Sequence, residues 1–144
     1  MSAPRVKSWC AALLVLCCAP AANAAAVTWV KVVGSGASQI FVDTGSIRQT
    51  GDIVSAWYRR DFNRPMLTEK KHLPYRSSKV LSYYNCADRE VAPAQWITYE
   101  KTGGMGKVIS NEKVISLSYG EVPRGEAGEA VFDFVCKYVK QQRK

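Results

Sequence analysis

The sequence of 144 residues contains a single histidine, His72, which limits the catalytic and metal chemistry that the chain can support. A zinc site built on His72 would need cysteine or carboxylate ligands nearby, and a histidine base would need a nucleophile at a readable spacing. Residues 70–74 supply neither. We therefore expect His72 to be a solvated loop residue rather than a metal ligand or a general base.

Familiar enzyme motifs are also lacking. Residues 103–107 superficially resemble a phosphate-binding loop, but Val108 stands where that loop needs serine or threonine. No Gly-x-Ser-x-Gly elbow occurs, and four acids of the chain follow no spacing typical of a carboxylate pair: Asp52, Asp61, Asp88 and Glu90. The sequence therefore predicts a protein that is not an enzyme and that uses no cofactor or metal.

The chain lacks an apolar run long enough to cross a membrane as a helix. The run from Trp9 to Ala19 has about half of the roughly 20 residues that a spanning helix needs. Arg5 and Lys7 precede it, and the small-residue sequence 22–24 (ANA) follows it, which is the pattern of a cleaved secretory signal. We expect residues 1–24 to be removed, leaving one domain over residues 25–144.

Export of this kind places the protein in the periplasm, on the outer-membrane surface or in the medium. A lipid anchor is the alternative, but a lipoprotein signal puts a small residue directly before the modified cysteine. Here Leu16 precedes Cys17, and Cys17 precedes Cys18. This arrangement favours a soluble exported form over a lipid-anchored one.

Cleavage would leave only two of the five cysteines, Cys86 and Cys136. Disulfides form and persist outside the cytoplasm, so we expect these two to be bonded. The bond would close a loop of about 50 residues, and the chain-entropy estimate for such a loop is roughly 4 kcal/mol of stabilisation at most. Both cysteines are then unavailable for catalysis or metal binding.

Acidic residues are scarce, with 12 against 20 basic residues and a formal net charge of +8. Removal of Arg5 and Lys7 with the signal lowers this charge to +6, because the segment contains no acid. A basic exported protein meets heparin-like sulfated glycans, anionic lipid, cell wall or acidic proteins rather than nucleic acid. The positive charge could also serve solubility alone.

The pattern of the domain predicts an α+β fold. A helix is indicated after Pro123 by apolar residues at three- and four-residue spacing: Ala127, Ala130, Val131, Phe134, Val135 and Tyr138. Residues 103–106 form the glycine-rich turn of a hairpin, and residues 64–74 are expected to form a long loop. Strands are predicted at residues 27–33, 39–43, 53–62, 76–86, 94–101 and 107–110. We expect a sheet of about six antiparallel strands, with the C-terminal helix packed on one face and tethered by the disulfide.

The disulfide also assigns the faces of the sheet. If Cys86 faces the helix, strand alternation turns Tyr84 and Val80 toward the helix as well. The same alternation separates Ile53 and Trp57 on one face from Val54, Ala56 and Tyr58 on the other. Large residues then remain on the face away from the helix, and a homodimer, an aromatic ligand or an overlying loop could cover them: Tyr75, Leu81 and Tyr83.

A basic and aromatic cluster is the most suggestive candidate for a binding surface. Arginine and aromatic residues anchor many protein interfaces, and a basic cluster could also hold heparin-like chains. The alternative is an ordinary solvated edge with Trp57 in the core. The cluster occupies two neighbouring predicted strands and the segment between them: Trp57, Tyr58, Arg59, Arg60, Arg64, Lys70, Lys71, Arg76 and Lys79.

Several short motifs, in this order and with the two-cysteine frame, resemble the bacterial surface-adhesin protein E family. They span about residues 28–136: FVD (41–43), SIR (46–48), GDIVSAW (51–57), YRSSK (75–79), YNCADR (84–89), GKV (106–108), VPRG (122–125), GEA (128–130) and VC (135–136).

The resemblance implies a six-stranded antiparallel sheet with a disulfide-tethered C-terminal helix, and a type member that dimerises. It further implies adhesion to host matrix or serum proteins such as laminin, vitronectin and plasminogen. The alternative from another functional class is a periplasmic protein that inhibits or assists an envelope enzyme.

Overall fold

The computed structural model describes residues 26–34, 36–125 and 127–143. The expected secretory signal, residues 1–24, lies outside the described residues. Within the described part no helix is long and apolar enough to cross a membrane.

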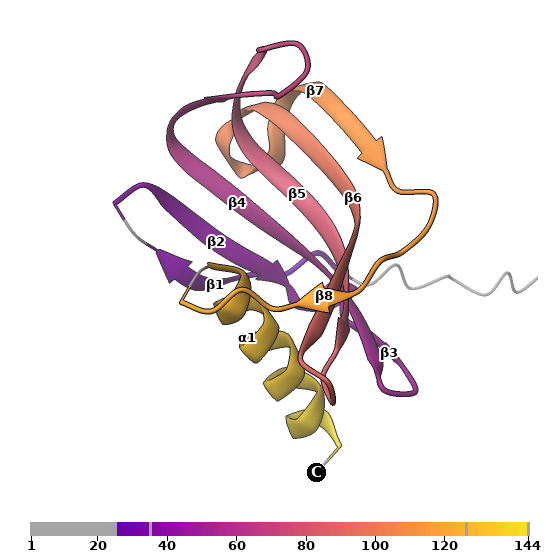
Figure 1. The fold of residues 1–144 in the computed structure, drawn as a ribbon. Helices are drawn as coiled ribbons and strands as arrows, with labels where there is room; N and C mark the ends of the chain where they lie inside the picture. The colour runs from indigo at the N-terminus through magenta and orange to yellow at the C-terminus, as the bar shows by residue number, and fades with distance from the viewer. Residues whose placement is uncertain (1–25, 35, 126, 144) are drawn as a thin grey trace, which may run out of the picture.

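One antiparallel sheet and one helix make up the fold (Figure 1). The main path of the sheet runs β1-β2-β4-β5-β6-β7, and β3 (Arg48–Thr50) and β8 (Gly120–Glu121) add short pairings to β4 and β6. The bounds along the path are β1 Trp29–Gly34, β2 Ser38–Asp43, β4 Ile53–Leu67, β5 Pro74–Asn85, β6 Glu90–Lys101 and β7 Met105–Lys113. The predicted antiparallel sheet is therefore confirmed, with two short strands added to the six expected.

The β4–β5 hairpin is much longer than expected. The prediction of a loop over residues 64–74 is wrong, because β4 continues to Leu67, β5 begins at Pro74 and only residues 68–73 connect them. The pairing shifts between Asp61 and Met66, so Pro65 lies in an irregular stretch where no ladder hydrogen bond is required of it. The prediction failed because proline and polar residues, which are typical of loops, also occur in the exposed outer part of this hairpin.

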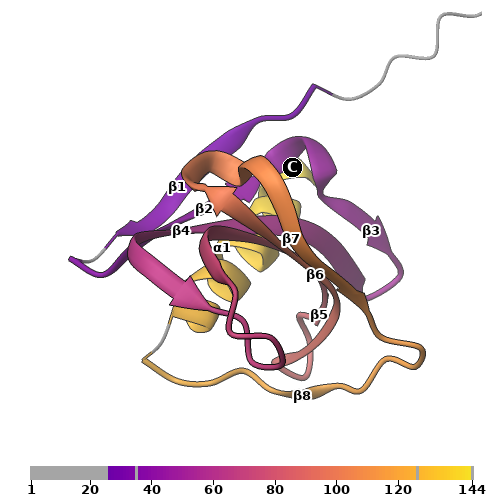
Figure 2. The same cartoon turned by 90° about the horizontal axis from the view of Figure 1, so that it is seen from above.

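Helix α1 (Ala127–Gln142) packs against β1, β2 and β4 on one face of the curled sheet (Figure 2). Its buried residues are Val131, Phe132, Val135 and Cys136. The predicted apolar stripe was therefore partly misplaced. Phe132 belongs to the core, where its ring meets that of Tyr84 edge to face, whereas Phe134 and Tyr138 stack on each other in half-buried positions.

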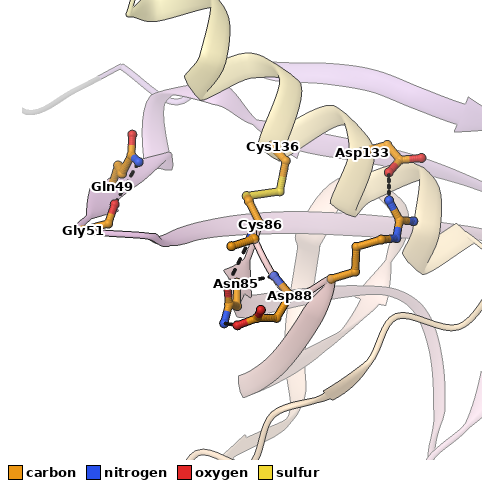
Figure 3. Close-up of a disulfide and its surroundings, with 9 residues drawn as sticks. Gln49, Gly51, Asn85, Cys86, Asp88, Asp133 and Cys136 are labelled. Atoms are coloured by element: carbon orange, nitrogen blue, oxygen red, sulfur yellow. Dashed lines mark hydrogen bonds and ion pairs between the residues drawn. A yellow bond between two sulfur atoms is a disulfide. The ribbon is translucent and has the colours of Figure 1, made fainter.

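The predicted Cys86–Cys136 disulfide is confirmed and joins the end of β5 to α1 (Figure 3). Arg89, in the adjoining turn, adds a polar link to the same helix. Its guanidinium contacts Glu129 at 3.1 Å and Asp133 at 3.2 Å and lies 5.0 Å above the Phe132 ring. Covalent, ionic and aromatic contacts thus hold the helix at one end of the sheet.

The assignment of faces made from strand alternation is confirmed for the central strands. Val54, Ala56 and Tyr84 are buried in the helix-side core, and Tyr58 packs against them. Burial raises the pKa of both Tyr58 and Tyr84 above its usual value, since a phenolate would lose its hydration there. These tyrosines therefore serve as neutral, space-filling core residues.

We expect the paired substitution Cys86→Ser/Cys136→Ser to lower the free energy of unfolding by about 2–4 kcal/mol. Without the bond, the unfolded chain gains conformational entropy, because two residues separated by 50 positions are no longer held together. Urea unfolding of the exported chain, followed by circular dichroism, measures this change. Reduction of the unsubstituted chain should produce a similar loss. Equal midpoints for the oxidised and reduced chains would contradict a stabilising role for the bond.

Candidate binding surface

Arg59 lies on the face of the sheet away from the helix and is enclosed by aromatic rings. Its guanidinium carbon is 4.9 Å from the Trp29 ring centre and 4.5 Å from that of Phe41. The carboxylate of Asp61 pairs with it at 3.1 Å, and the side chains of Arg59 and Asp61 are only 12% and 16% exposed. Arg59 is therefore engaged inside the protein and offers little charge to a partner.

The glycine-rich turn after β6 closes over this pair. Asp61 accepts a hydrogen bond from the Gly103 amide at 2.9 Å, and Ser77 accepts one from the Gly104 amide at 3.0 Å. Gly104 has φ +69° and lies so close to Lys79 that a Cβ atom would be 2.4 Å from the lysine Cε. The predicted hairpin turn is confirmed, and it covers part of the face opposite the helix.

Lys79 belongs to the same internal group. Its ammonium lies 5.7 Å from the Trp29 ring centre and 5.1 Å from that of Tyr99. Burial raises the pKa of Tyr99, so that its ring stays neutral beneath the cation. Aromatic rings therefore surround Arg59 and Lys79, and these two cations do not form an open basic surface.

Arg60 points to the other face, as alternation requires. Its Nε donates to the Ser38 hydroxyl at 3.0 Å, and its guanidinium lies 5.0 Å from the Phe62 ring centre. Arg60 and Arg64 line an open groove of about 420 Å³, together with residues 36–38 and three further residues: Phe62, Asn63 and Met66. The groove combines two cations with an aromatic and an aliphatic wall.

The remaining basic residues of the predicted cluster lie near the end of the β4–β5 hairpin. Arg76 donates to the backbone oxygens of Phe62 and Asn63 at 3.3 and 3.2 Å. Lys70 makes an exposed ion pair with Glu112 at 3.7 Å, and Lys71 is exposed. The structure thus brings Arg60, Arg64 and Arg76 together, places the two lysines at the tip and separates all of them from Arg59 and Lys79.

The aromatic and apolar members of the predicted sites divide in the same way. Trp57 is paired across β4 and β5 with Leu81, and Ser55 is paired with Tyr83, so these side chains share the face away from the helix. All four of these side chains are half-buried. Tyr75 instead packs edge to face on Phe62, with ring centres 5.6 Å apart, and Tyr58 belongs to the helix-side core.

Sequence reasoning missed several residues that shape this surface. Trp29 and Phe41 lie far from Arg59 in the chain, and only the β1-β2-β4 pairing brings them to it.

His72 is exposed in the turn between β4 and β5, with φ +49°. Among the described residues, no three histidine, cysteine or acidic side chains lie together as metal ligands would.

Two comparisons with known proteins give matches, one to a family model and one to solved structures. The family model described as surface-adhesin protein E matches residues 29–137. Three solved structures of Haemophilus influenzae protein E share the fold at low sequence identity. The structure from the non-typeable bacterium has 14% identity and a TM-score of 0.58, and the match covers 78% of each chain.

A second structure of that protein has 13% identity and a TM-score of 0.56, covering 78% of this chain and 86% of the other. A structure of crystal form II of the same protein has 13% identity and a TM-score of 0.56, and the match covers 76% of this chain and 87% of the other. The search of curated proteins finds no match. The match to the family model therefore establishes the family, and the solved structures establish the fold.

We expect Asp61→Ala to lower the free energy of unfolding by about 2–3 kcal/mol, because it leaves the enclosed Arg59 guanidinium unpaired and releases the Gly103 amide. Urea denaturation measures the change. The matched control is Glu112→Ala, which breaks an exposed pair and should cost less than about 1 kcal/mol. Equal losses in the two variants would show that the Arg59–Asp61 pair has no special structural weight.

Proposed function

Because the chain belongs to the surface-adhesin protein E family, we propose that it is an exported, non-catalytic adhesin that binds host matrix or serum proteins. Export removes residues 1–24 as the secretory signal, and the single domain over residues 25–144 is the functional form. The outer-membrane surface is the location that this function requires.

The observation that supports this proposal is the groove between Arg60 and Arg64. Arg64 is exposed and has no hydrogen-bond or ion-pair partner among the described residues, and Arg60 uses only its Nε in the bond to Ser38. Two guanidinium groups beside Phe62 and Met66 can bind a carboxylate of a protein ligand and also pack against an apolar side chain. Such a mixed surface suits a protein partner better than a small polar metabolite.

Laminin, vitronectin and plasminogen are the candidate ligands, and heparin-like glycans are candidates by charge. Arg76, Lys70 and Lys71 extend the positive surface beyond the groove. Exposed charges of this kind speed the encounter of oppositely charged partners and make binding sensitive to salt. The contact surface is thus the exposed part of the Trp57–Lys79 region, without Arg59 and Lys79.

A homodimer is also part of the proposal. It would form through the face away from the helix, at Leu81 and Tyr83, without Tyr75, whose ring packs on Phe62. Both positions are half-buried rather than fully covered. The molar mass from light scattering tests this point, and the mass of one chain at high concentration would exclude the dimer.

We expect Arg60→Glu/Arg64→Glu to weaken binding to immobilised vitronectin or laminin by at least about tenfold, since both groove charges are reversed. Biolayer interferometry with the exported chain measures the affinity. The single variant Arg64→Glu should lose a smaller part, and it leaves the Arg60–Ser38 bond intact.

The matched control is Lys137→Glu/Lys140→Glu, which changes the net charge equally on exposed positions of the helix. It should bind almost as the unsubstituted chain does. If the groove variants and this control lose the same affinity, or if neither loses any, the groove is not the contact surface.

We expect protease treatment of intact cells to remove the chain while a periplasmic marker protein survives, because an adhesin must be displayed outside. Immunoblotting of treated cells measures both proteins. Survival of the chain together with the marker would place it in the periplasm and favour a role with an envelope enzyme instead.

A further inference from the structure

The tip of the β4–β5 hairpin exposes three large apolar side chains. Met66 is 42% exposed, Leu67 58% and Leu73 41%. Met66 and Leu67 end β4, and Leu73 is the last residue of the turn before β5, at the top of Figure 1 and away from the C-terminal end of the helix. Exposed apolar residues concentrated on one projecting element indicate a contact surface.

The turn that carries these residues is held by its own hydrogen bonds. The Thr68 amide donates to the Leu73 carbonyl at 3.0 Å, and the His72 amide donates to the Thr68 carbonyl at 2.9 Å. The Thr68 hydroxyl accepts from the Leu73 amide at 3.0 Å. The leucines are therefore presented on an ordered turn, so little conformational entropy is lost when they are buried.

Basic residues surround the same tip. Lys70 and Lys71 lie in the turn, and Arg64 and Arg76 lie on the strands beneath it. The acids that face them are Glu69 in the turn and Glu112 on β7, and the Lys70–Glu112 pair is weak because its side chains are 80% and 58% exposed. The tip is therefore both apolar and positively charged.

Another exposed apolar segment of the described chain differs in charge. Val114, Ile115 and Leu117, between β7 and β8, are 39%, 106% and 41% exposed. No basic residue occurs within residues 114–119. Lys113 directly precedes this segment, whereas the hairpin tip has Lys70 and Lys71 between its leucines and two arginines on its strands.

We propose that the β4–β5 tip docks onto an anionic phospholipid bilayer. Leu67 and Leu73 enter the boundary between headgroups and acyl chains, and Lys70 and Lys71 contact lipid phosphates. Apolar side chains flanked by lysines are the composition that binds membrane interfaces, where acyl chains cover the one kind and anionic headgroups attract the other. This inference does not depend on protein binding in the Arg60–Arg64 groove, although Lys70 and Lys71 also extend the proposed protein contact surface.

Cosedimentation of the exported chain with vesicles tests the inference. We expect binding to mixed phosphatidylglycerol and phosphatidylcholine vesicles, little binding to pure phosphatidylcholine, and weaker binding in high salt. Leu67→Ser/Leu73→Ser should weaken binding to the anionic vesicles by about tenfold. Ile115→Ser, which removes a more exposed apolar side chain elsewhere, should leave it unchanged.

Charge variants separate docking at the tip from general attraction. Each basic residue at an anionic surface contributes roughly a fivefold factor, so Lys70→Glu/Lys71→Glu should weaken vesicle binding by about 25-fold or more. The control Lys137→Glu/Lys140→Glu carries the same change in net charge on the helix. Equal losses in the two variants would overturn docking by the tip.

Insertion is measured with Leu67→Trp, whose fluorescence should shift to shorter wavelength when anionic vesicles are added. When the same vesicles are added to Ile115→Trp, the fluorescence wavelength should shift no more than that of the unsubstituted chain, which contains only the native tryptophans. Absence of vesicle binding by the unsubstituted chain would overturn the inference. So would leucine variants that lose vitronectin binding but keep vesicle binding, since the tip would then be a protein contact. Failure of the groove variants affects only the proposed adhesion.

Discussion

The attachment of the C-terminal helix to one face of the sheet is the constraint on which the rest of the molecule depends. The Cys86–Cys136 bond fixes where the helix lies, and Phe132 fills the space against Tyr84 beneath it. Because strand side chains alternate, this one attachment decides which residues of every neighbouring strand belong to the core. It also leaves a second face that a single helix cannot cover.

The chain covers much of that second face with its own cations. Arg59 lies between Trp29 and Phe41, and Asp61 and the Gly103 turn close the group from above. An enclosed guanidinium between rings is stable only with a paired carboxylate, so these residues depend on each other. The consequence for function is a division of the basic residues, because those used in this face are withdrawn from binding.

The sequence predicts this fold well and its binding surface only in part, for physical reasons. Alternation and helical spacing are local rules, and they correctly place Tyr84, Val54 and both cysteines. Arg59 and Arg60 are adjacent in the chain, so a cluster defined along the sequence joins them, although alternation turns them to opposite faces. The contact of Trp29 with Arg59 depends on the order of strands in the sheet, which no local pattern contains.

The exposed end of the molecule follows from unequal strand lengths. β4 has 15 residues, whereas β2 has six and pairs with it only as far as Phe62. On the other side, the pairing of β5 with β6 begins at Ser77. The outer part of the β4–β5 hairpin therefore pairs with no further strand on either side, although Lys70 reaches Glu112 of β7. Unpaired edges are protected by charge and proline, here Arg64 and Pro65. Apolar residues retained on such an unsupported hairpin add nothing to the core, so contact with a partner is the physical explanation that remains for them.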